Sequence, residues 1–137
     1  MSAVAAGRVD VIVSDHTPHT TDRKQRPFDA AEPGSVGLET TMAASFGTGI
    51  DPAVLLRALS WRPAELIGLG TPLERSLQPG APADIVVIDP DESWVARVGS
   101  MATLGTNCAF EGSELVGRVR ATIVDGRVVV DQGKVAA

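Results

Sequence analysis

One acidic residue and two histidines stand close together near the beginning of this sequence, within Ser14-Asp15-His16-Thr17-Pro18-His19. A carboxylate beside an imidazole can bind a metal ion, transfer a proton or orient a substrate. The chain contains two histidines in total, so any imidazole chemistry depends on this short segment. We therefore take Asp15 and His19 as the first candidate functional residues.

An apolar run leads into this segment. Residues 9–13 read Val-Asp-Val-Ile-Val, and a short β-branched run of this kind predicts a strand that is buried on both faces, as in parallel sheets. Barrels and open α/β sheets keep their catalytic groups at the carboxyl ends of such strands. The run thus predicts that Asp15 lies at a catalytic strand end.

The same residues also have a purely structural interpretation. Asp and Ser at a strand end often form turns, because their side chains hydrogen-bond nearby backbone N–H groups. His16 would then be a partner of the loop rather than a ligand. His19 lies on a long loop that contains Pro18, Pro27 and Pro33, and such loops inside compact domains tend to be functional or mobile.

Helices are predicted between this loop and the middle of the chain. Residues 38–46 contain neither Gly nor Pro and predict a helix. Asp51 followed by Pro52 predicts a capped helix start, since Pro is well tolerated at the first helical position. We expect Pro63 to stop that helix and to begin a short one that ends near residues 68–70.

Strands are predicted in the last third of the chain. Residues 85–88 predict a buried strand. Asp125 and Gly126 lie between two β-rich arms and accept the positive φ angles of a type I′ turn, so a hairpin is expected over residues 123–130. The one plausible domain boundary falls between residues 70 and 82, where Pro and Gly residues gather.

The composition is that of a globular domain and excludes several kinds of protein. Hydrophobic residues make up 44% and charged residues 21% of the chain, near the averages of globular domains. The net charge of −5 argues against nucleic acid binding, and no apolar run approaches the roughly 18 residues of a membrane span. A single cysteine, Cys108, excludes an internal disulfide and a cysteine-cluster zinc site. We expect part of a cytoplasmic enzyme that binds neither nucleic acid nor membranes.

Several motifs resemble those of dihydroorotases, which are metal-dependent amidohydrolases with a (β/α)8 barrel. The most specific pair is the segment from Ser14 to His19 followed by Gly37-Leu38-Glu39-Thr40. Weaker matches follow in the same order along the chain: Arg62-Pro63-Ala64, residues 80–89, Asn107 with Phe110-Glu111-Gly112, and residues 117–126. The resemblance runs from Val9 to Val130 and so covers nearly the whole chain.

The length of the chain limits what this resemblance implies. A complete (β/α)8 barrel takes about 250 residues, and this chain has 137. The resemblance therefore implies an α/β fold, namely the C-terminal part of a (β/α)8 metal-dependent hydrolase barrel plus strands of the small β-sandwich domain. We expect barrel elements in residues 1–75 and the β domain in residues 76–137. Residues 1–8 are expected to end a barrel helix rather than to form a secretory signal. We therefore expect the chain to be a fragment, an internal start or a truncated gene product.

The resemblance also implies a reaction and its cofactor. In this family one or two Zn²⁺ ions hold and acidify a hydroxide that attacks a cyclic amide, since zinc lowers the pKa of bound water. Asp15 would contact a metal and relay the proton to the leaving nitrogen, while His19 would contact the substrate carboxylate. The reaction interconverts carbamoyl aspartate and dihydroorotate in pyrimidine synthesis. The family's other metal-binding histidines and its bridging lysine have no counterpart in this chain.

One departure leaves a second function open. Where many active dihydroorotases have Pro-Phe-Gly, this chain has Glu32-Pro33-Gly34. The family holds its substrate through backbone at this point, which implies substrate-binding roles for Pro33 and Gly34, yet Pro33 has no N–H to donate. A similar Glu-Pro-Gly segment occurs in dihydroorotase-like proteins that lack metal ligands and serve as structural partners of aspartate carbamoyltransferase.

Three functions therefore remain open for the complete protein. The first is a zinc-dependent dihydroorotase, whose partner besides the small-molecule substrate would be a second copy of itself or aspartate carbamoyltransferase. The second is a non-catalytic dihydroorotase-like scaffold for aspartate carbamoyltransferase. The third, more distant, is an amidohydrolase that acts on another cyclic amide.

Overall fold

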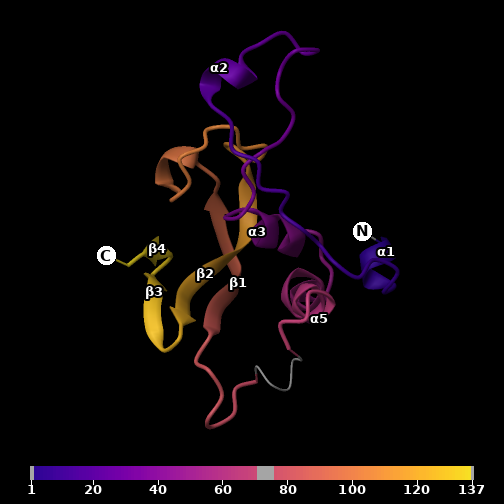
Figure 1. The fold of residues 1–137 in the computed structure, drawn as a ribbon, viewed down its shortest axis with the longest axis vertical. Helices are drawn as coiled ribbons and strands as arrows, with labels where there is room; N and C mark the ends of the chain where they lie inside the picture. Colours follow the sequence, from indigo (N-terminus) through magenta and orange to yellow (C-terminus); the bar gives the residue numbers. More distant parts are fainter. Residues whose placement is uncertain (1, 71–75, 137) are drawn as a thin grey trace.

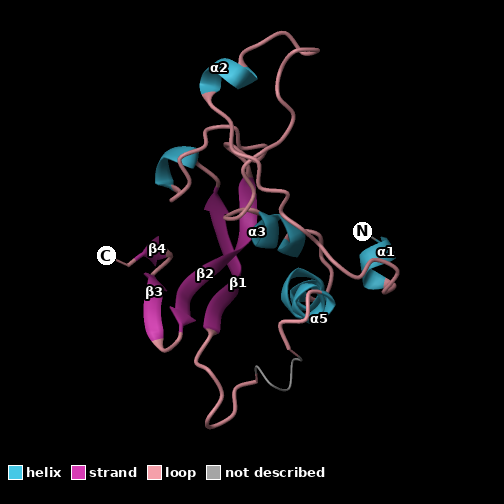
Figure 2. Ribbon diagram, viewed as in Figure 1, coloured by secondary structure: helices cyan, strands magenta, loops and turns pink. Residues whose placement is uncertain are grey.

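Helices occupy the first half of the chain and an antiparallel sheet the second. The computed structural model describes residues 2–70 and 76–136. The helical elements are α1 (Ser2–Ala5), α2 (Thr21–Lys24), α3 (Thr41–Phe46), α4 (Pro52–Leu56), the π-helix η1 (Arg57–Trp61), α5 (Arg62–Leu66) and the 3-10 helix η2 (Val98–Ser100). The strands are β1 (Ile85–Val95), β2 (Glu114–Val124), β3 (Arg127–Asp131) and β4 (Lys134–Val135). Figures 1 and 2 show α1, α3 and α5 to one side of the strands, and α2 on a long loop beyond the end of the sheet.

The sheet has the strand order β1-β2-β3-β4, with each strand antiparallel to the next. The predicted hairpin is confirmed, because Val124 pairs with Arg127 across a two-residue turn. Asp125 has φ 48° and Gly126 has φ 76°, and positive φ at both central positions is what a type I′ turn requires. The twist of this turn matches that of the strands it joins, so the local sequence is sufficient to set the register here.

Strand β1 is more exposed than its apolar sequence predicted. Residues 85–88 do lie in β1, but Val86 and Val87 keep 51% and 48% of their surface exposed, so the prediction of a buried strand is wrong. β1 is an edge strand of the sheet. It also carries Pro90 and a register shift between Asp89 and Ser93, features that are typical of edge strands because Pro cannot donate to a neighbour.

The middle of the chain forms one continuous helical rod. Asp51 caps α4, and its carboxylate accepts the N–H of Ala53 at 2.8 Å, which confirms the predicted start. The predicted stop at Pro63 is wrong, because η1 and α5 continue the rod through this proline to Leu66. The predicted short helix is present as α5, which has Pro63 in its first turn. In a regular α-helix the proline ring would clash with the carbonyl four residues earlier. The wider π turn at Arg57–Trp61 gives the ring room.

Helix α3 joins the helical half to the sheet. It begins at Thr41, three residues later than predicted, because residues 38–40 form a turn. Phe46 at its end packs on Gly117 of β2, where an added Cβ would lie 2.7 Å from the Phe46 ring. Phe46 shares one apolar cluster with Val4 and Leu55, whereas Ala43 on the same helix belongs to a second cluster with Ala96 and Leu115. Helix α3 is thus the contact between the two halves of the core.

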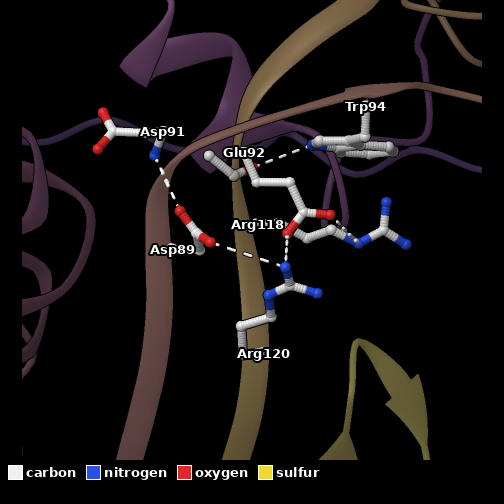
Figure 3. A network of polar contacts seen from close by, with 7 residues as sticks. Asp89, Asp91, Glu92, Trp94, Arg118 and Arg120 are labelled. Carbon is white, nitrogen blue, oxygen red and sulfur yellow. Dashed lines mark hydrogen bonds and ion pairs between the residues drawn. The ribbon is translucent and has the colours of Figure 1, made fainter.

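A charged cluster lies where β1 and β2 run side by side (Figure 3). The carboxylate of Glu92 forms ion pairs with Arg120, at 2.6 Å, and with Arg118, at 3.8 Å. Asp89 adds a longer contact of 3.6 Å to Arg120. The guanidinium of Arg118 also stacks over the ring of Trp94, 4.9 Å from its centroid. Because opposite charges alternate across the two strands, the cluster holds their register around the irregular stretch of β1.

Residues 9–13 form no strand, so this prediction is wrong. Val13 is 72% exposed, and the segment has no ladder partner among the described residues. A strand needs a neighbour to complete its backbone hydrogen bonds, and the sheet in this chain lies elsewhere. The predicted domain boundary includes residues 71–75, which lie outside the described residues. No helix in the described ranges is both long enough and apolar enough to span a membrane.

Candidate functional site

The segment before Asp15 is anchored to the helical rod rather than to a sheet. In the π turn the N–H of Arg62 bonds to the carbonyl of Arg57. In the same pattern, the N–H of residue 63 would bond to the carbonyl of Ala58, but Pro63 has no N–H. That carbonyl instead accepts the N–H of Ile12 at 2.9 Å. Because Pro63 leaves the Ala58 carbonyl free, this carbonyl can hold the segment before Asp15 on the rod.

An ion pair reinforces this anchor. Arg62 donates to the carboxylate of Glu65 at 2.6 Å and to that of Asp10 at 3.3 Å. The hydrogen bond that Arg62 donates to the Glu65 carboxylate is the largest of the effects that raise the pKa of Arg62 above its usual value. The Arg-Pro-Ala motif thus has a structural role, since both Arg62 and Pro63 tie residues 10–12 to α5 and η1.

Asp15 has an unusual backbone conformation. Its φ is 45°, and the other described non-glycine residues with positive φ, Asp125 and Gln132, lie in the two tight turns of the sheet. Asp tolerates this region better than most residues, but the conformation still costs energy and is enriched at functional sites. The carbonyl of Asp15 accepts the hydroxyl of Thr17 at 2.9 Å. Its carboxylate is exposed and is available to a ligand.

His16 is a structural partner of the loop, as one of the two interpretations predicted. Its Nδ1 accepts the N–H of Gly37 at 3.1 Å and, less closely, that of Leu38 at 3.4 Å. A nitrogen that accepts carries no proton, so the proton of the neutral ring is on Nε2. Gly37 is required here because a Cβ would lie 2.7 Å from the carbonyl oxygen of Ser14.

His19, Pro33 and Gly34 come together on one side of the long loop. The imidazole Nε2 of His19 lies 2.9 Å from the carbonyl oxygen of Pro33. Because a carbonyl can only accept, Nε2 is the protonated nitrogen in this contact. The backbone N–H of His19 bonds to Asn107 Oδ1 at 3.0 Å, and the carbonyl of Gly34 accepts Asn107 Nδ2 at 3.2 Å. The predicted substrate-binding residues thus form one cluster.

The long loop is closed by side chains from its own first turn. Lys24 in α2 donates its ammonium to the carbonyls of Glu32, at 2.7 Å, and Gly34, at 3.2 Å. Arg23 adds an ion pair of 3.6 Å to the Glu32 carboxylate. The Lys24 and Arg23 contacts order the loop although it contains only a single turn of helix. Near the same turn, a hydrogen bond from Thr20 holds the pKa of Asp22 below its usual value.

The Gly-Leu-Glu-Thr segment is also explained by the structure. Both carboxylate oxygens of Glu39 accept backbone N–H groups, from Ala102 at 3.0 Å and from Thr103 at 2.9 Å. Thr41 donates its hydroxyl to the carbonyl of Gly37 at 2.7 Å. This motif therefore connects the loop after Asp15 with residues 101–107 before β2.

The structure does not bring all the predicted site residues together. No hydrogen bond or ion pair among the described residues joins the Asp15 side chain to His19, Pro33 or Gly34. Nor do three or more His, Cys, Asp or Glu side chains within residues 2–70 and 76–136 converge on a point where a metal could bind. A catalytic zinc needs about three protein ligands, so the residues described here do not by themselves fit a zinc site.

Sequence reasoning missed the groups that assemble the cluster. Asn107 and Lys24 bond to its backbone, yet neither was assigned a role from the sequence. Asn107 was noted only as part of a motif, although an Asn between Gly105 and Cys108 is a residue type that often bonds to neighbouring backbone. Lys24 had no signal, because its acceptors are carbonyls that any residue could supply.

Known proteins resemble this chain over nearly all of its length. A sequence model of the Amidohydrolase family matches residues 3–129. A dihydroorotase of Geotalea daltonii is 36% identical over 132 residues, 93% of this chain and 30% of the relative. A dihydroorotase of Pelotomaculum thermopropionicum is 40% identical over 132 residues, again 93% of this chain and 30% of the relative.

The fold has a counterpart among solved structures. A D-hydantoinase (dihydropyrimidinase) from Thermus sp. superposes with a TM-score of 0.86 at 28% identity, over 99% of this chain and 31% of that protein. The helices and sheet described above therefore occur together as one part of a longer hydrolase. The chain spans about a third of the length of the relatives it matches.

Proposed function

Because this chain belongs to the amidohydrolase family, we propose that it forms the carboxyl-terminal part of a dihydroorotase-like cyclic amidohydrolase. The complete enzyme would interconvert N-carbamoyl-L-aspartate and L-dihydroorotate. The observation that carries this proposal is the cluster of His19, Pro33 and Gly34. His19 of this cluster follows four residues after Asp15, whose side chain is exposed and whose backbone has a positive φ. A substrate with both a cyclic amide and a carboxylate suits this combination of an acid–base group and an anion-binding group.

Each site residue has a proposed role. Asp15 would accept a proton from the attacking water and pass it to the leaving amide nitrogen. His19, whose Nε2 lies near the Pro33 carbonyl, would contact the substrate carboxylate through its imidazole ring. Gly34 would offer its backbone N–H to the substrate.

A zinc site in the complete protein would need ligands from outside this chain in addition to Asp15. When bound, zinc would acidify a water molecule and polarise the amide carbonyl. Asp15 would contribute one carboxylate ligand, and the remaining ligands would come from other parts of the protein, since the described residues do not form a site by themselves.

One observation favours the non-catalytic scaffold as a second candidate. Pro33 stands where many active dihydroorotases have a residue with a backbone N–H, and its carbonyl is occupied by His19. A scaffold protein would need the loop for shape rather than for binding a substrate. The two candidates differ in whether the site turns over a cyclic amide.

A chimera tests the proposal directly. Residues 3–129 would replace the matching third of the Geotalea daltonii dihydroorotase, and dihydroorotate hydrolysis would be measured at saturating zinc. Matched controls are the relative without that third and the chimera with Asp15→Asn. Bound zinc and gel filtration would report whether each protein is assembled.

The outcomes separate the candidates. Turnover in the chimera, with none in either control, is expected if this chain supplies a working site. An assembled, zinc-loaded chimera that is inactive on dihydroorotate would favour the scaffold. Turnover of hydantoin but not dihydroorotate would point to a different cyclic amide.

A further inference from the structure

We propose that Asn107 is a positioning residue that holds His19 and Gly34 in the arrangement needed to bind the substrate. The inference rests on the proposed function in one respect, because it takes His19 and Gly34 as the substrate-binding residues. Asn107 lies 88 residues after His19 in the sequence, yet it contacts both sides of the loop. It would not touch the substrate itself.

Three hydrogen bonds use the whole side-chain amide of Asn107. Oδ1 accepts the backbone N–H of His19 at 3.0 Å, while Nδ2 donates to the carbonyl of Thr17 at 2.8 Å and to that of Gly34 at 3.2 Å. One partner is a donor and two are acceptors, so only one orientation of the amide satisfies all of them. A donor and an acceptor on the same short side chain are needed, a combination that Asp and Leu lack.

The backbone around Asn107 is packed tightly enough to place this amide accurately. The carbonyl of Asn107 accepts the N–H of Val36 at 3.0 Å. Two residues earlier, a Cβ on Gly105 would lie 2.6 Å from Cγ1 of Val36 and 2.9 Å from Cβ of Pro18. The Asn107 segment therefore lies against both parts of the loop that carry the cluster.

A purely structural role can be distinguished because the same segment is held at a second point. Glu39 accepts the N–H groups of Ala102 and Thr103. Like Asn107, it ties residues 101–107 to the loop after Asp15, but it contacts neither His19 nor Gly34. Glu39→Gln is thus a matched control that loosens the segment without touching the cluster.

The first experiment uses the chain of residues 1–137 itself. Amide hydrogen exchange and the ring signals of His19 would be followed by NMR in the wild type, Asn107→Asp and Glu39→Gln. The Asn107→Asp side chain would keep the acceptor but lose both donors, and it would place a carboxylate against two carbonyl oxygens. We expect the exchange of the His19 amide to rise by about ten- to a hundredfold in Asn107→Asp and by much less in Glu39→Gln. If Asn107→Asp does not fold, Asn107→Ser, which keeps a smaller donor and acceptor, takes its place.

The second experiment measures kinetics in the chimera. A positioning role for substrate binding predicts that Asn107→Asp raises KM for dihydroorotate by about tenfold or more, with a much smaller change in kcat. Glu39→Gln should leave KM close to that of the unmodified chimera.

Each result decides the proposal. Unchanged His19 exchange in Asn107→Asp, or an equal effect of Glu39→Gln on exchange or KM, would overturn it. If the unmodified chimera has no activity, the dihydroorotase proposal fails, but the NMR comparison still decides whether Asn107 positions His19 and Gly34.

Discussion

Nδ1 of His16 accepts the backbone N–H of Gly37 at 3.1 Å, so the histidine beside Asp15 connects two parts of the loop. Asp15 and His16 are neighbours in the sequence but differ in what they do. The carboxylate of Asp15 is exposed, whereas the ring of His16 is half-buried against the turn that precedes α3. The pair is therefore better described as an exposed carboxylate on a supported backbone than as a joint metal site.

Gly37→Ala should destabilise the chain by roughly 1–3 kcal/mol, as expected when a methyl group is forced into a packed site. The added Cβ would lie 2.7 Å from the Ser14 carbonyl oxygen and 3.3 Å from the Thr41 hydroxyl. Urea unfolding followed by tryptophan fluorescence would measure the change. Gly99→Ala is the control, since no atom lies within 4 Å of its Cβ position; equal stabilities of the two variants would contradict the packing described here.

Asp51→Ala should cost about 1 kcal/mol, because the N–H of Ala53 loses the side chain that caps α4. Asp51→Asn should keep most of the stability, since the amide oxygen can accept the same bond. Thermal unfolding followed by circular dichroism would compare the two variants. If Asp51→Asn loses as much stability as Asp51→Ala, the charge of Asp51 or another of its contacts matters more than the cap.

Glu92→Gln should lower the stability of the sheet by about 0.5–1 kcal/mol, since it removes the carboxylate shared by Arg118 and Arg120. The loss should shrink at high salt, which screens the ion pairs of the wild type. Asp91→Asn is the control, because in Figure 3 the Asp91 carboxylate points away from both arginines. Chemical unfolding at low and high salt would measure both variants, and a loss that does not depend on salt would argue for packing instead.

Asp15 and His19 should differ in their kinetic effects in an active chimera. Asp15→Asn should abolish turnover and leave the fold intact, because an amide cannot accept the proton. His19→Ala should chiefly raise KM for the carboxylate-bearing substrate. Steady-state kinetics on dihydroorotate would measure both, and normal turnover in Asp15→Asn would remove Asp15 from the mechanism.

The chain of residues 1–137 alone should neither hydrolyse dihydroorotate nor bind zinc tightly. Asp15 and His19 would offer at most two ligands, whereas a catalytic zinc needs about three. The exposed valines of β1 and β3, among them Val86 and Val128, should also favour self-association. Equilibrium dialysis with zinc, a turnover assay and light scattering test these expectations. Stoichiometric zinc and measurable turnover from a monomer would mean that this chain contains a complete small enzyme.

Local features were predicted correctly from the sequence. The hairpin at Asp125 and Gly126 and the helix cap at Asp51 depend on residues within a few positions of each other. Their conformations are set by φ preferences and by short side-chain contacts, which do not change with the rest of the fold. The choice of Asp15 as a candidate also came from its neighbours in the chain, and its role stays a prediction.

Features that depend on distant partners were decided by the tertiary structure. Residues 9–13 have the composition of a strand, but a strand forms only beside another strand, and here Ile12 bonds to the helical rod at Ala58 instead. Pro63 did not stop its helix, because a π turn makes room for the ring and the freed carbonyl finds a partner elsewhere in the chain.

The site shows the same division. The resemblance of the sequence motifs to those of dihydroorotases identified His19, Pro33 and Gly34 as candidates for substrate binding. In the folded chain Asn107 connects this cluster, because its three hydrogen bonds join backbone groups of Thr17, His19 and Gly34 that are distant from it in the sequence. Backbone N–H and carbonyl groups are the same in nearly every residue, so only the folded chain decides which of them a side chain will bind.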